Sequence, residues 1–453
     1  MTGQRTDRLL PALVYAALTT SVVSSLGMLL VPSIADAMGI TIGSTQWMLT
    51  VNLMVGAVAT PIMGRLSDGP RPGRLLLIAL GVIFVGSVVA AVAPNFTVFL
   101  IGRALQGLSY GIVPVTIVLA RRHLSADQVS PAISSLSVTV ATGLGLGYPL
   151  TGVLASWLDY RAAFWFAAAF VATAAIVVWR FVPIGADENT AKPFDVPGAA
   201  LLSVGLAALL IAVSEGPNWG WGSVTTICVA LVAVGALVAW GFVELRRRHP
   251  LIDLRVVRTA EVLLANATAI CLGASMYMSL SIASIIAQAP ASTGYGIDLP
   301  LFWAGFVMLP LSVGSFTGNR FVRRLGPESM TAMLPLGSAL TAGSAVMLWL
   351  TNDQLWEILL GMALFGLGMG AAYAAMPALV ARNVADTEVG SAVSFNQVLR
   401  TVGGALGSAV AGAVLAANPG EHGVTLGLGI AAIIGIVVFV ALAVNQVRVH
   451  RTG

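Results

Sequence analysis

Long apolar stretches dominate this chain, and short polar segments separate them. About fourteen stretches reach the ~20 residues that an α-helix needs to cross a bilayer. Lipid offers the backbone no hydrogen-bond partner, so each stretch is predicted to be helical. The predicted spans are 10–32, 45–64, 75–93, 97–119, 131–155, 163–182, 198–214, 223–243, 262–287, 301–319, 330–350, 357–380, 390–416 and 424–446.

The basic residues fall on one side of this ladder of spans. Of the 23 Lys and Arg residues, twenty lie in every second inter-span segment or in the two termini. The segments between them carry acidic residues and a single base, Arg161. Short loops rich in Lys and Arg stay in the cytoplasm. The pattern therefore predicts an all-α polytopic membrane protein with both termini cytoplasmic.

Composition narrows the class further. The chain is 57% hydrophobic and 9% charged, with a mean hydropathy of +0.91, which is unlike an ordinary soluble domain. Its bases lie where they set topology and meet lipid headgroups, so no nucleic-acid partner is predicted. Both cysteines fall inside apolar spans, so neither a disulfide nor a metal site is expected. No nucleophile–base pair, phosphate loop or cofactor motif indicates an enzyme.

Glycine pairs reveal a weak internal repeat. Pairs in the fourth and fifth spans recur in the twelfth and thirteenth, at an offset close to 260 residues: Gly107/Gly111 with Gly366/Gly370, and Gly143/Gly147 with Gly403/Gly407. The repeat predicts two six-helix bundles, at 1–183 and 259–453. A linker, an inserted two-helix hairpin and a basic cytoplasmic linker occupy 184–258. Repeated helical halves around a central site are typical of secondary transporters.

The first motif lies in the loop after the second span and reads Gly64-Arg-Leu-Ser-Asp68-Gly-Pro-Arg71-Pro-Gly-Arg74. Gly64 would let two helices approach, while Asp68 can cap a helix end and pair with a base of a neighbouring helix. Gly64, Asp68, Arg71 and Arg74 are predicted to latch one conformation. The alternative is a solvated basic turn that only enforces topology.

The second motif, Arg103-Ala-Leu-Gln106-Gly-Leu-Ser-Tyr110-Gly, lies inside the fourth span. An arginine within an apolar span is costly and is a functional hypothesis by default. Gln106 follows one helical turn later, so both side chains can face one cavity. We predict that Arg103 and Gln106 take part in proton or substrate coupling, and that Tyr110 lines the substrate cavity.

The third motif, in the fifth span, is Gly143-Leu-Gly-Leu-Gly147-Tyr148-Pro149-Leu-Thr-Gly152. Closely spaced glycines allow tight helix packing, and proline breaks the hydrogen-bond ladder to give a kink. Gly143, Gly147, Pro149 and Gly152 are predicted to act in gating, and Tyr148 to line the cavity. A packing face without influence on the direction of transport is the alternative.

The inserted hairpin carries the fourth motif, Phe194-Asp-Val-Pro197-Gly, followed by Ser214-Glu215-Gly-Pro-Asn-Trp-Gly-Trp221. Pro197 suits the first turn of a helix, the tryptophans suit a membrane interface, and Glu215 is expected to be an outside loop charge. The four motifs together resemble the major facilitator superfamily, and in particular its fourteen-span drug:proton antiporter (multidrug efflux) family. This resemblance covers nearly the whole chain.

The resemblance implies a major facilitator fold and export of amphiphilic drug-like compounds, driven by protons, across a bacterial cytoplasmic membrane. It also implies antibiotic resistance and a monomer surrounded by lipid. Two motifs depart from the family pattern. Two extra residues separate the acid and the glycine of the first motif, and Tyr148 intervenes before Pro149.

A third departure concerns the first span, where the family carries an acidic residue. Alignment on Pro32 places that position at Val23, and all 19 acidic residues of the chain sit in loops or near span ends. A carboxylate in a cavity of low dielectric constant is the usual proton-binding group of such carriers. Asp36, just outside the first span, is the nearest substitute, although a plain loop aspartate is the alternative.

In the C-terminal half, Asn396, Gln397 and Arg400 share one face of the thirteenth span. With Asn52 and Asn266 they are predicted to line the substrate cavity; interhelical hydrogen bonding is the alternative. Arginines in the spans without an embedded acid suit an anionic or neutral amphiphile at least as well as a cation. A lipid or lipid-precursor carrier, an uncoupled facilitator and a non-transporting membrane sensor or scaffold remain alternatives.

Overall fold

The computed structural model describes residues 3–125, 128, 132, 136, 143, 147–185, 194–247, 250–252, 254–257, 259–325, 330–382 and 389–452. Every regular element in these ranges is a helix, which confirms the predicted all-α membrane class. Thirteen helices within the described ranges are long and apolar enough to cross a membrane. Most of the predicted span 131–155 lies outside the described residues, so the count of fourteen stays a prediction.

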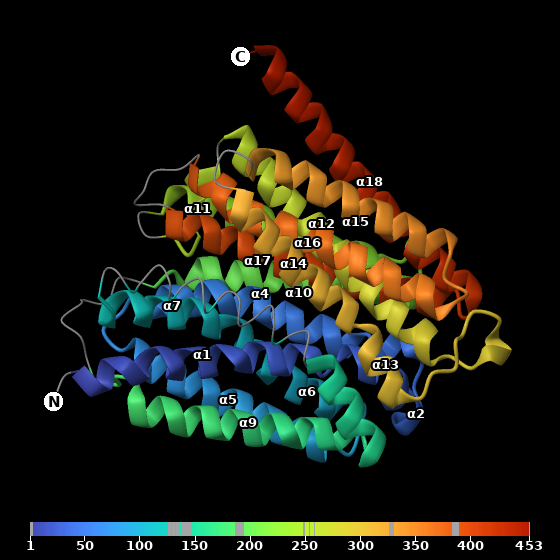
Figure 1. Ribbon diagram of the computed structural model, residues 1–453, viewed down its shortest axis with the longest axis horizontal. Coiled ribbons are helices and arrows are strands. Elements are labelled where there is room, and N and C mark those ends of the chain that lie inside the picture. Colours follow the sequence, from blue (N-terminus) through green and yellow to red (C-terminus); the bar gives the residue numbers. More distant parts are fainter. Residues whose placement is uncertain are drawn as a thin grey trace.

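The first half of the chain forms one group of helices (Figure 1, blue to green). Residues 147–157 are also helical and precede its last member. The elements are α1 Gly3–Ser25, η1 Met28–Leu30, α2 Val31–Met38, α3 Ile42–Thr45, α4 Trp47–Ser67, α5 Pro72–Val92, α6 Phe96–Gln106, η2 Gly107–Gly111, α7 Ile112–His123 and α9 Tyr160–Phe181.

The inserted hairpin and the second half follow (Figure 1, green to red). Their elements are α10 Val196–Trp219, α11 Val224–Arg246, η3 Leu254–Val257, α12 Ala260–Gln288, η4 Ala291–Thr293, α13 Leu301–Val307, α14 Leu309–Leu325, α15 Met330–Leu350, α16 Leu355–Arg382, α17 Val389–Ala417 and α18 Glu421–Thr452. Polar side chains cap several of these helices where they begin, for example Ser223 on α11 and Thr259 on α12.

The helix pairings of the first half recur in the second. The pairs α5–α9 and α1–α9 match α15–α18 and α12–α18. The repeated glycines lie at a different pair of contacts: a Cβ on Gly143 would be 2.7 Å from Ser21 of α1, and one on Gly403 of α17 would meet the backbone of Ile270 on α12. Both halves therefore use small residues for close packing against the corresponding helices α1 and α12.

Helices α4 and α17 form the seam between the two halves, and α10 lies along both of them. The second hairpin helix, α11, packs on α10 and otherwise presents large apolar side chains outward, including Leu231, Val238 and Phe242. Such a surface suits lipid contact. The hairpin is thus a cover over one side of the seam, with α10 inside and α11 outside.

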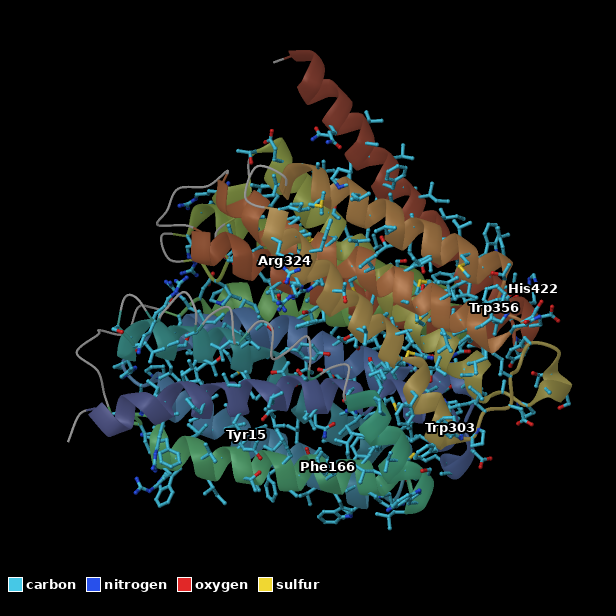
Figure 2. The ribbon with its side chains drawn as sticks, in the orientation of Figure 1. Tyr15, Phe166, Trp303, Arg324, Trp356 and His422 are labelled. Atoms are coloured by element: carbon cyan, nitrogen blue, oxygen red, sulfur yellow. The ribbon has the colours of Figure 1, made fainter. Side chains whose placement is uncertain are left out.

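The two halves close against each other at the end that carries the acidic loops. Ser284 Oγ and Gln288 Nε2 of α12 donate to the carbonyl oxygens of Met28 and Leu29, at 3.3 and 3.0 Å. Gln46 Nε2 donates to Ser281 Oγ at 2.6 Å. The exposed Trp303 and Trp356 lie at this same end, opposite the N-terminus (Figure 2), as interfacial anchors do.

Candidate functional site

Two arginines and three tyrosines meet near the middle of the helix bundle. The hydroxyl groups of Tyr110, from η2, and Tyr277, from α12, are 3.2 Å apart and join the two halves. Tyr277 lies within electrostatic range of both Arg103 and Arg400. We call this set the central cluster. Its members are Arg103, Gln106, Tyr110, Tyr277, Tyr373 and Arg400.

Arg103 is almost wholly buried, at 1% exposure. Its Nη1 donates to Gln106 Oε1 at 2.6 Å, and its Nε donates to the carbonyl of Met48 at 3.3 Å. The guanidinium also lies 5.8 Å from the ring centroid of Phe164. Among the described residues no carboxylate pairs with it, so neutral oxygens and an aromatic face hold the charge.

Val23, the position of the missing acid in the first span, lies next to Arg103. Arg103 Nη1 donates to the backbone carbonyl of Val23 at 3.5 Å. Val23 is where the family carries a carboxylate. The guanidinium of Arg103 therefore lies beside the backbone carbonyl of Val23, and a peptide dipole stands where the resemblance implies a full charge.

The rest of the second motif is held inside the first half. Gln106 Nε2 donates to Ser87 Oγ at 2.9 Å, and Asn52 Nδ2 donates to the carbonyl of Arg103 at 3.0 Å. A Cβ on Gly107 would lie 2.6 Å from the carbonyl oxygen of Asn52. Asn52, predicted to line the cavity, thus braces the arginine-bearing helix.

Arg400 is held differently. Its Nη2 donates to Gln397 Oε1 on the same helix, and its guanidinium lies 4.3 Å from the ring centroid of Tyr373 on α16. The side chain is only half buried. One face of the group is therefore stacked, and Gln397 is the only hydrogen-bond acceptor it has among the described residues.

Two further predicted cavity residues pair with each other. Asn396 Nδ2 of α17 donates to Asn266 Oδ1 of α12 at 2.9 Å, and both side chains are buried. Asn396 and Arg400 thus engage different neighbouring helices, although they are four residues apart. The geometry of the asparagines matches the interhelical alternative.

Tyr148 belongs to the closed end of the bundle. It is 2% exposed and its hydroxyl lies 3.9 Å from Met28 Sδ. Gly152 and Pro149 pack against the backbone of Gly305, while a Cβ on Gly147 would collide with Ser25 Oγ. The third motif is therefore a close-packed contact to both halves.

The predicted substitute acid, Asp36, is not part of the central cluster. It is exposed on α2 and makes no side-chain hydrogen bond or ion pair with a residue in the described ranges. The structure does not bring it near the groups with which it was predicted to act.

The loop after α4 differs from the expected latch. The Asp68 carboxylate lies 3.8 Å from Arg65 of its own helix. Arg122 of the neighbouring α7 donates instead to the carbonyl oxygens of Ser67, Asp68 and Gly69, at 2.8 to 3.0 Å. A base from a neighbouring helix does cap α4, but it does so through the backbone.

The other predicted latch residues are not closely packed against a neighbouring helix. A Cβ on Gly64 would meet only Pro114, at 3.9 Å, so the two helices do not need glycine there. Arg71 is exposed at the start of α5, and Arg74 is exposed one turn later.

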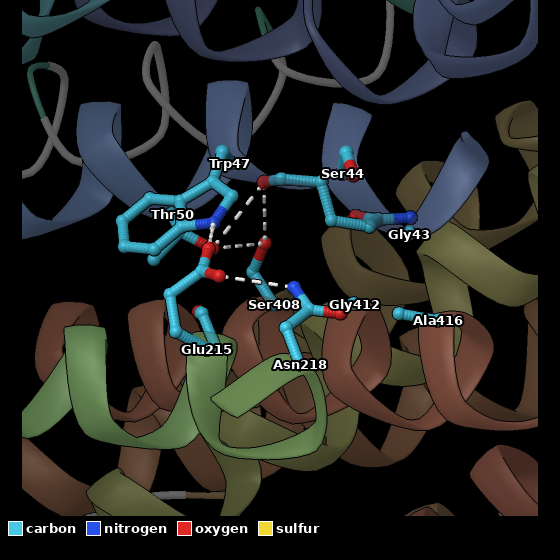
Figure 3. A pocket seen from close by; sticks show the side chains of 11 residues that line it. Gly43, Ser44, Trp47, Thr50, Glu215, Asn218, Ser408, Gly412 and Ala416 are labelled. Carbon is cyan, nitrogen blue, oxygen red and sulfur yellow. Dashed lines mark hydrogen bonds between the residues drawn. The ribbon is translucent and has the colours of Figure 1, made fainter. Parts of the chain in front are cut away.

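Glu215 is not a loop charge, because α10 continues to Trp219. Its carboxylate accepts hydrogen bonds from Trp47 Nε1 and Asn218 Nδ2, both at 2.9 Å. It lines a shallow pocket of about 280 Å³ where α4, α10 and α17 meet at the closed end (Figure 3). Beside it, Thr50 Oγ1 donates to Ser408 Oγ at 3.0 Å and ties the seam together.

Sequence reasoning missed two features. Tyr373 was not among the predicted site residues, because a tyrosine in an apolar span gives no periodic signal. Glu244 and Asp195 were placed in linkers, yet their side chains are buried, at 0% and 3% exposure. Trp240, one turn before Glu244, donates to it at 2.9 Å and is the signal that the sequence offered.

The comparisons with known proteins cover almost the whole chain. The sequence model of the Major Facilitator Superfamily matches residues 12–408 and also 331–452. A triacylglyceride transporter of Mycolicibacterium smegmatis is 29% identical over 430 residues, which span 89% of this chain and 74% of that protein. A puromycin resistance protein of Streptomyces alboniger is 28% identical, over 86% of this chain and 79% of its own length.

Solved structures show the same fold at low sequence identity. A peptide transporter crystallised with sulfate superposes with a TM-score of 0.69 at 15% identity, over 97% of this chain and 94% of that one. The human organic anion transporter MFSD10 gives 0.61 at 16% identity, over 96% and 99%.

Proposed function

Because this chain belongs to the major facilitator superfamily, we propose that it exports amphiphilic small molecules across a bacterial cytoplasmic membrane by alternating access. The two halves rock about the central cluster. The closed end, held by Gln46, Ser284 and Gln288, opens when the opposite end closes.

The observation that carries this proposal is the contact between the halves at Tyr110 and Tyr277. It places a half-buried guanidinium, Arg400, beside polarisable rings where the halves meet. A binding site at that point is exposed to alternate sides as the halves rock. Several relatives are named for resistance to, or export of, antibiotics, among them the tetracenomycin C resistance and export protein of Streptomyces glaucescens.

The charge of the site selects the substrate class. In the described part of the chain, neither arginine of the central cluster has a carboxylate partner. A substrate carboxylate, phenolate or carbonyl oxygen can supply the missing acceptor to Arg400, and the tyrosine rings can stack on an apolar body. We therefore propose a neutral or anionic amphiphile as the preferred substrate, with proton influx as the driving reaction.

Transport by the purified protein in liposomes tests this proposal. A pH gradient is imposed, and the uptake of matched cationic, neutral and anionic amphiphiles is followed with a lumenal pH dye. We expect anionic or neutral compounds to accumulate while the gradient decays, and Arg400→Gln to abolish this. Arg324→Gln, at an exposed position on α14, is the matched control (Figure 2).

Accumulation of cations alone would contradict the proposed substrate class. Equilibration of every compound with a silent dye would contradict active export and leave an uncoupled facilitator.

A lipid substrate is the second candidate, and one feature favours it. An apolar surface follows the seam between α4, α10 and α17, made by Met54, Leu206, Leu210, Val402 and Leu406. An acyl chain can lie against such a surface once the halves move apart. Leu206→Asp would impair transfer of a fluorescent triacylglycerol between vesicles if lipid is the cargo, and would leave soluble amphiphiles unaffected.

A further inference from the structure

Two acidic side chains are buried together at the cytoplasmic end of the inserted hairpin. Asp195 caps the first turn of α10, and Glu244 lies in the last turn of α11. A Cβ on Gly198 would come within 3.0 Å of both Asp195 Oδ2 and Glu244 Oε1, so these oxygens are less than about 6 Å apart. Glycine at 198 makes room for the pair.

The two carboxylates have unequal partners. Asp195 Oδ1 accepts the backbone N–H of Gly198 at 3.1 Å and lies 3.7 Å from Arg247 Nε. The positive end of α10 also stabilises its charge. Glu244 has the indole N–H of Trp240 and faces the backbone amides of Leu251 and Ile252. Among the described residues, only Asp195 is therefore paired with a cation.

One oxygen of each carboxylate is buried without a hydrogen-bond partner in the described structure, Asp195 Oδ2 and Glu244 Oε2. The other described charged groups here are Arg246, which is exposed, and Arg255, which donates to the carbonyls of Leu245 and Arg247. From the neighbouring helices, Ala57, Val58 and Ile62 of α4 and Phe395 of α17 belong to the apolar cluster at this end of the hairpin. Two ionised carboxylates at this depth would leave a negative charge unbalanced.

We infer that Glu244 is a proton-binding site and that it carries a proton while Asp195 stays ionised. Protonation makes Glu244, which has no cation partner in the described part of the chain, uncharged, and it removes the repulsion between the two carboxylates. This site goes beyond the central cluster. It also supplies a proton-binding carboxyl to a chain whose first span has none.

The site is connected to both halves through the linker that follows α11. Leu251 and Ile252, whose amides face Glu244, are buried against Ala57 of α4 and Phe395 of α17. Loss of the proton places a second negative charge beneath these residues and draws in water or Arg247. The linker then loosens from the seam. Proton release to the cytoplasm thus frees the two halves to separate at this end, a step that rests on the proposed transport function.

Infrared difference spectroscopy of the full-length protein in liposomes tests proton binding without any substrate. We expect a band from a buried protonated carboxyl that disappears on raising the pH, and that is missing in Glu244→Gln. Glu215→Gln, which removes the other indole-bonded glutamate of the hairpin, is the matched control and keeps the band. A band that persists in Glu244→Gln, or no such band in the wild type, would overturn the inference.

A second variant guards against misfolding of the first. Asp195→Asn removes the neighbouring negative charge, so Glu244 ionises more readily and its band disappears at a lower pH than in the wild type. An unchanged or higher midpoint would contradict the paired arrangement.

Trypsin cleavage of the basic linker tests the mechanical step. Cleavage there, normalised to cleavage at Arg71 and Arg74, should rise several-fold with pH in the wild type and stay low in Glu244→Gln. Equal pH dependence in the two proteins would refute the loosening of the linker. Neither the infrared measurement nor the cleavage assay requires a transported substrate. Both can therefore be interpreted even if the export proposal fails.

Discussion

The two arginines of the central cluster come from different halves, Arg103 from α6 and Arg400 from α17, and differ in what holds them. Arg103 is 1% exposed and donates to three oxygens of its own half. Arg400 is half buried, stacks on Tyr373 and has Gln397 as its described acceptor. The first is built into the fold, while the second keeps capacity for a ligand.

This difference separates two roles that the sequence assigned together. A guanidinium whose donors are already used by backbone carbonyls positions helices and gains little from binding a substrate. A guanidinium with unused donors beside an aromatic ring can accept an anionic group at little cost in reorganisation. The comparison therefore assigns stability mainly to Arg103 and substrate recognition mainly to Arg400.

The largest expected effect is on the buried arginine. Arg103→Ala leaves Gln106 Oε1 and two carbonyl oxygens without a donor and opens a cavity, so it should destabilise the protein by about 3 kcal/mol. Thermal unfolding in detergent measures the loss of stability. Arg400→Ala, tested in parallel, should unfold close to the wild-type temperature. Equal losses of stability in the two variants would contradict the different roles assigned to the two arginines.

Removal of Arg400 should instead weaken substrate binding. A charge-assisted hydrogen bond contributes about 1.5–3 kcal/mol, so Arg400→Ala should raise the apparent Kd of an anionic amphiphile roughly 10- to 100-fold. Arg400→Lys keeps the charge but loses the planar stack, and should restore part of the affinity. Fluorescence quenching measures binding of the anionic ligand and of a neutral analogue as control. Equal losses of affinity for both ligands would contradict recognition of the anionic group by Arg400.

A smaller effect is expected where the halves touch. Tyr110→Phe and Tyr277→Phe each remove one hydroxyl of a single hydrogen bond, so each should cost about 1 kcal/mol. Because they share that bond, the double variant should change the transport rate about as much as either single variant. Additive losses in the double-mutant cycle would show that the hydroxyl groups act separately.

The smallest effect is expected outside the cluster. Asp36→Asn changes an exposed side chain on α2, and exposed substitutions usually cost less than about 0.5 kcal/mol, or roughly twofold in rate. Proton-coupled uptake in liposomes is the measurement. Loss of coupling in this variant would restore Asp36 as the substitute acid and weaken the case for Glu244.

The motifs show how far local sequence can reach. Arg103 and Gln106 were predicted to act together, and they share a 2.6 Å hydrogen bond, because residues three apart on a helix are neighbours by geometry alone. Asn396 and Arg400 satisfy the same geometric rule but contact different helices. Their spacing could not reveal which helices pack on either side of α17.

The acidic residues show the same limit in another form. The first span lacks a carboxylate, and the sequence alone establishes that absence. The burial of Glu244 depends on the linker folding back over the hairpin, a contact between segments that hydropathy treats as a helix end and a polar loop. A charge count along the chain could not detect it.

The order of apolar and basic residues is enough to establish a helical membrane protein with a repeated architecture. The reason is that lipid forces apolar segments of ~20 residues into helices, whatever their neighbours are. Tertiary structure alone decided which polar groups inside those helices are satisfied and which remain open to a ligand or a proton. Hydrogen bonding and desolvation depend on the atoms brought within a few ångströms, and in this chain many of those atoms come from the other half.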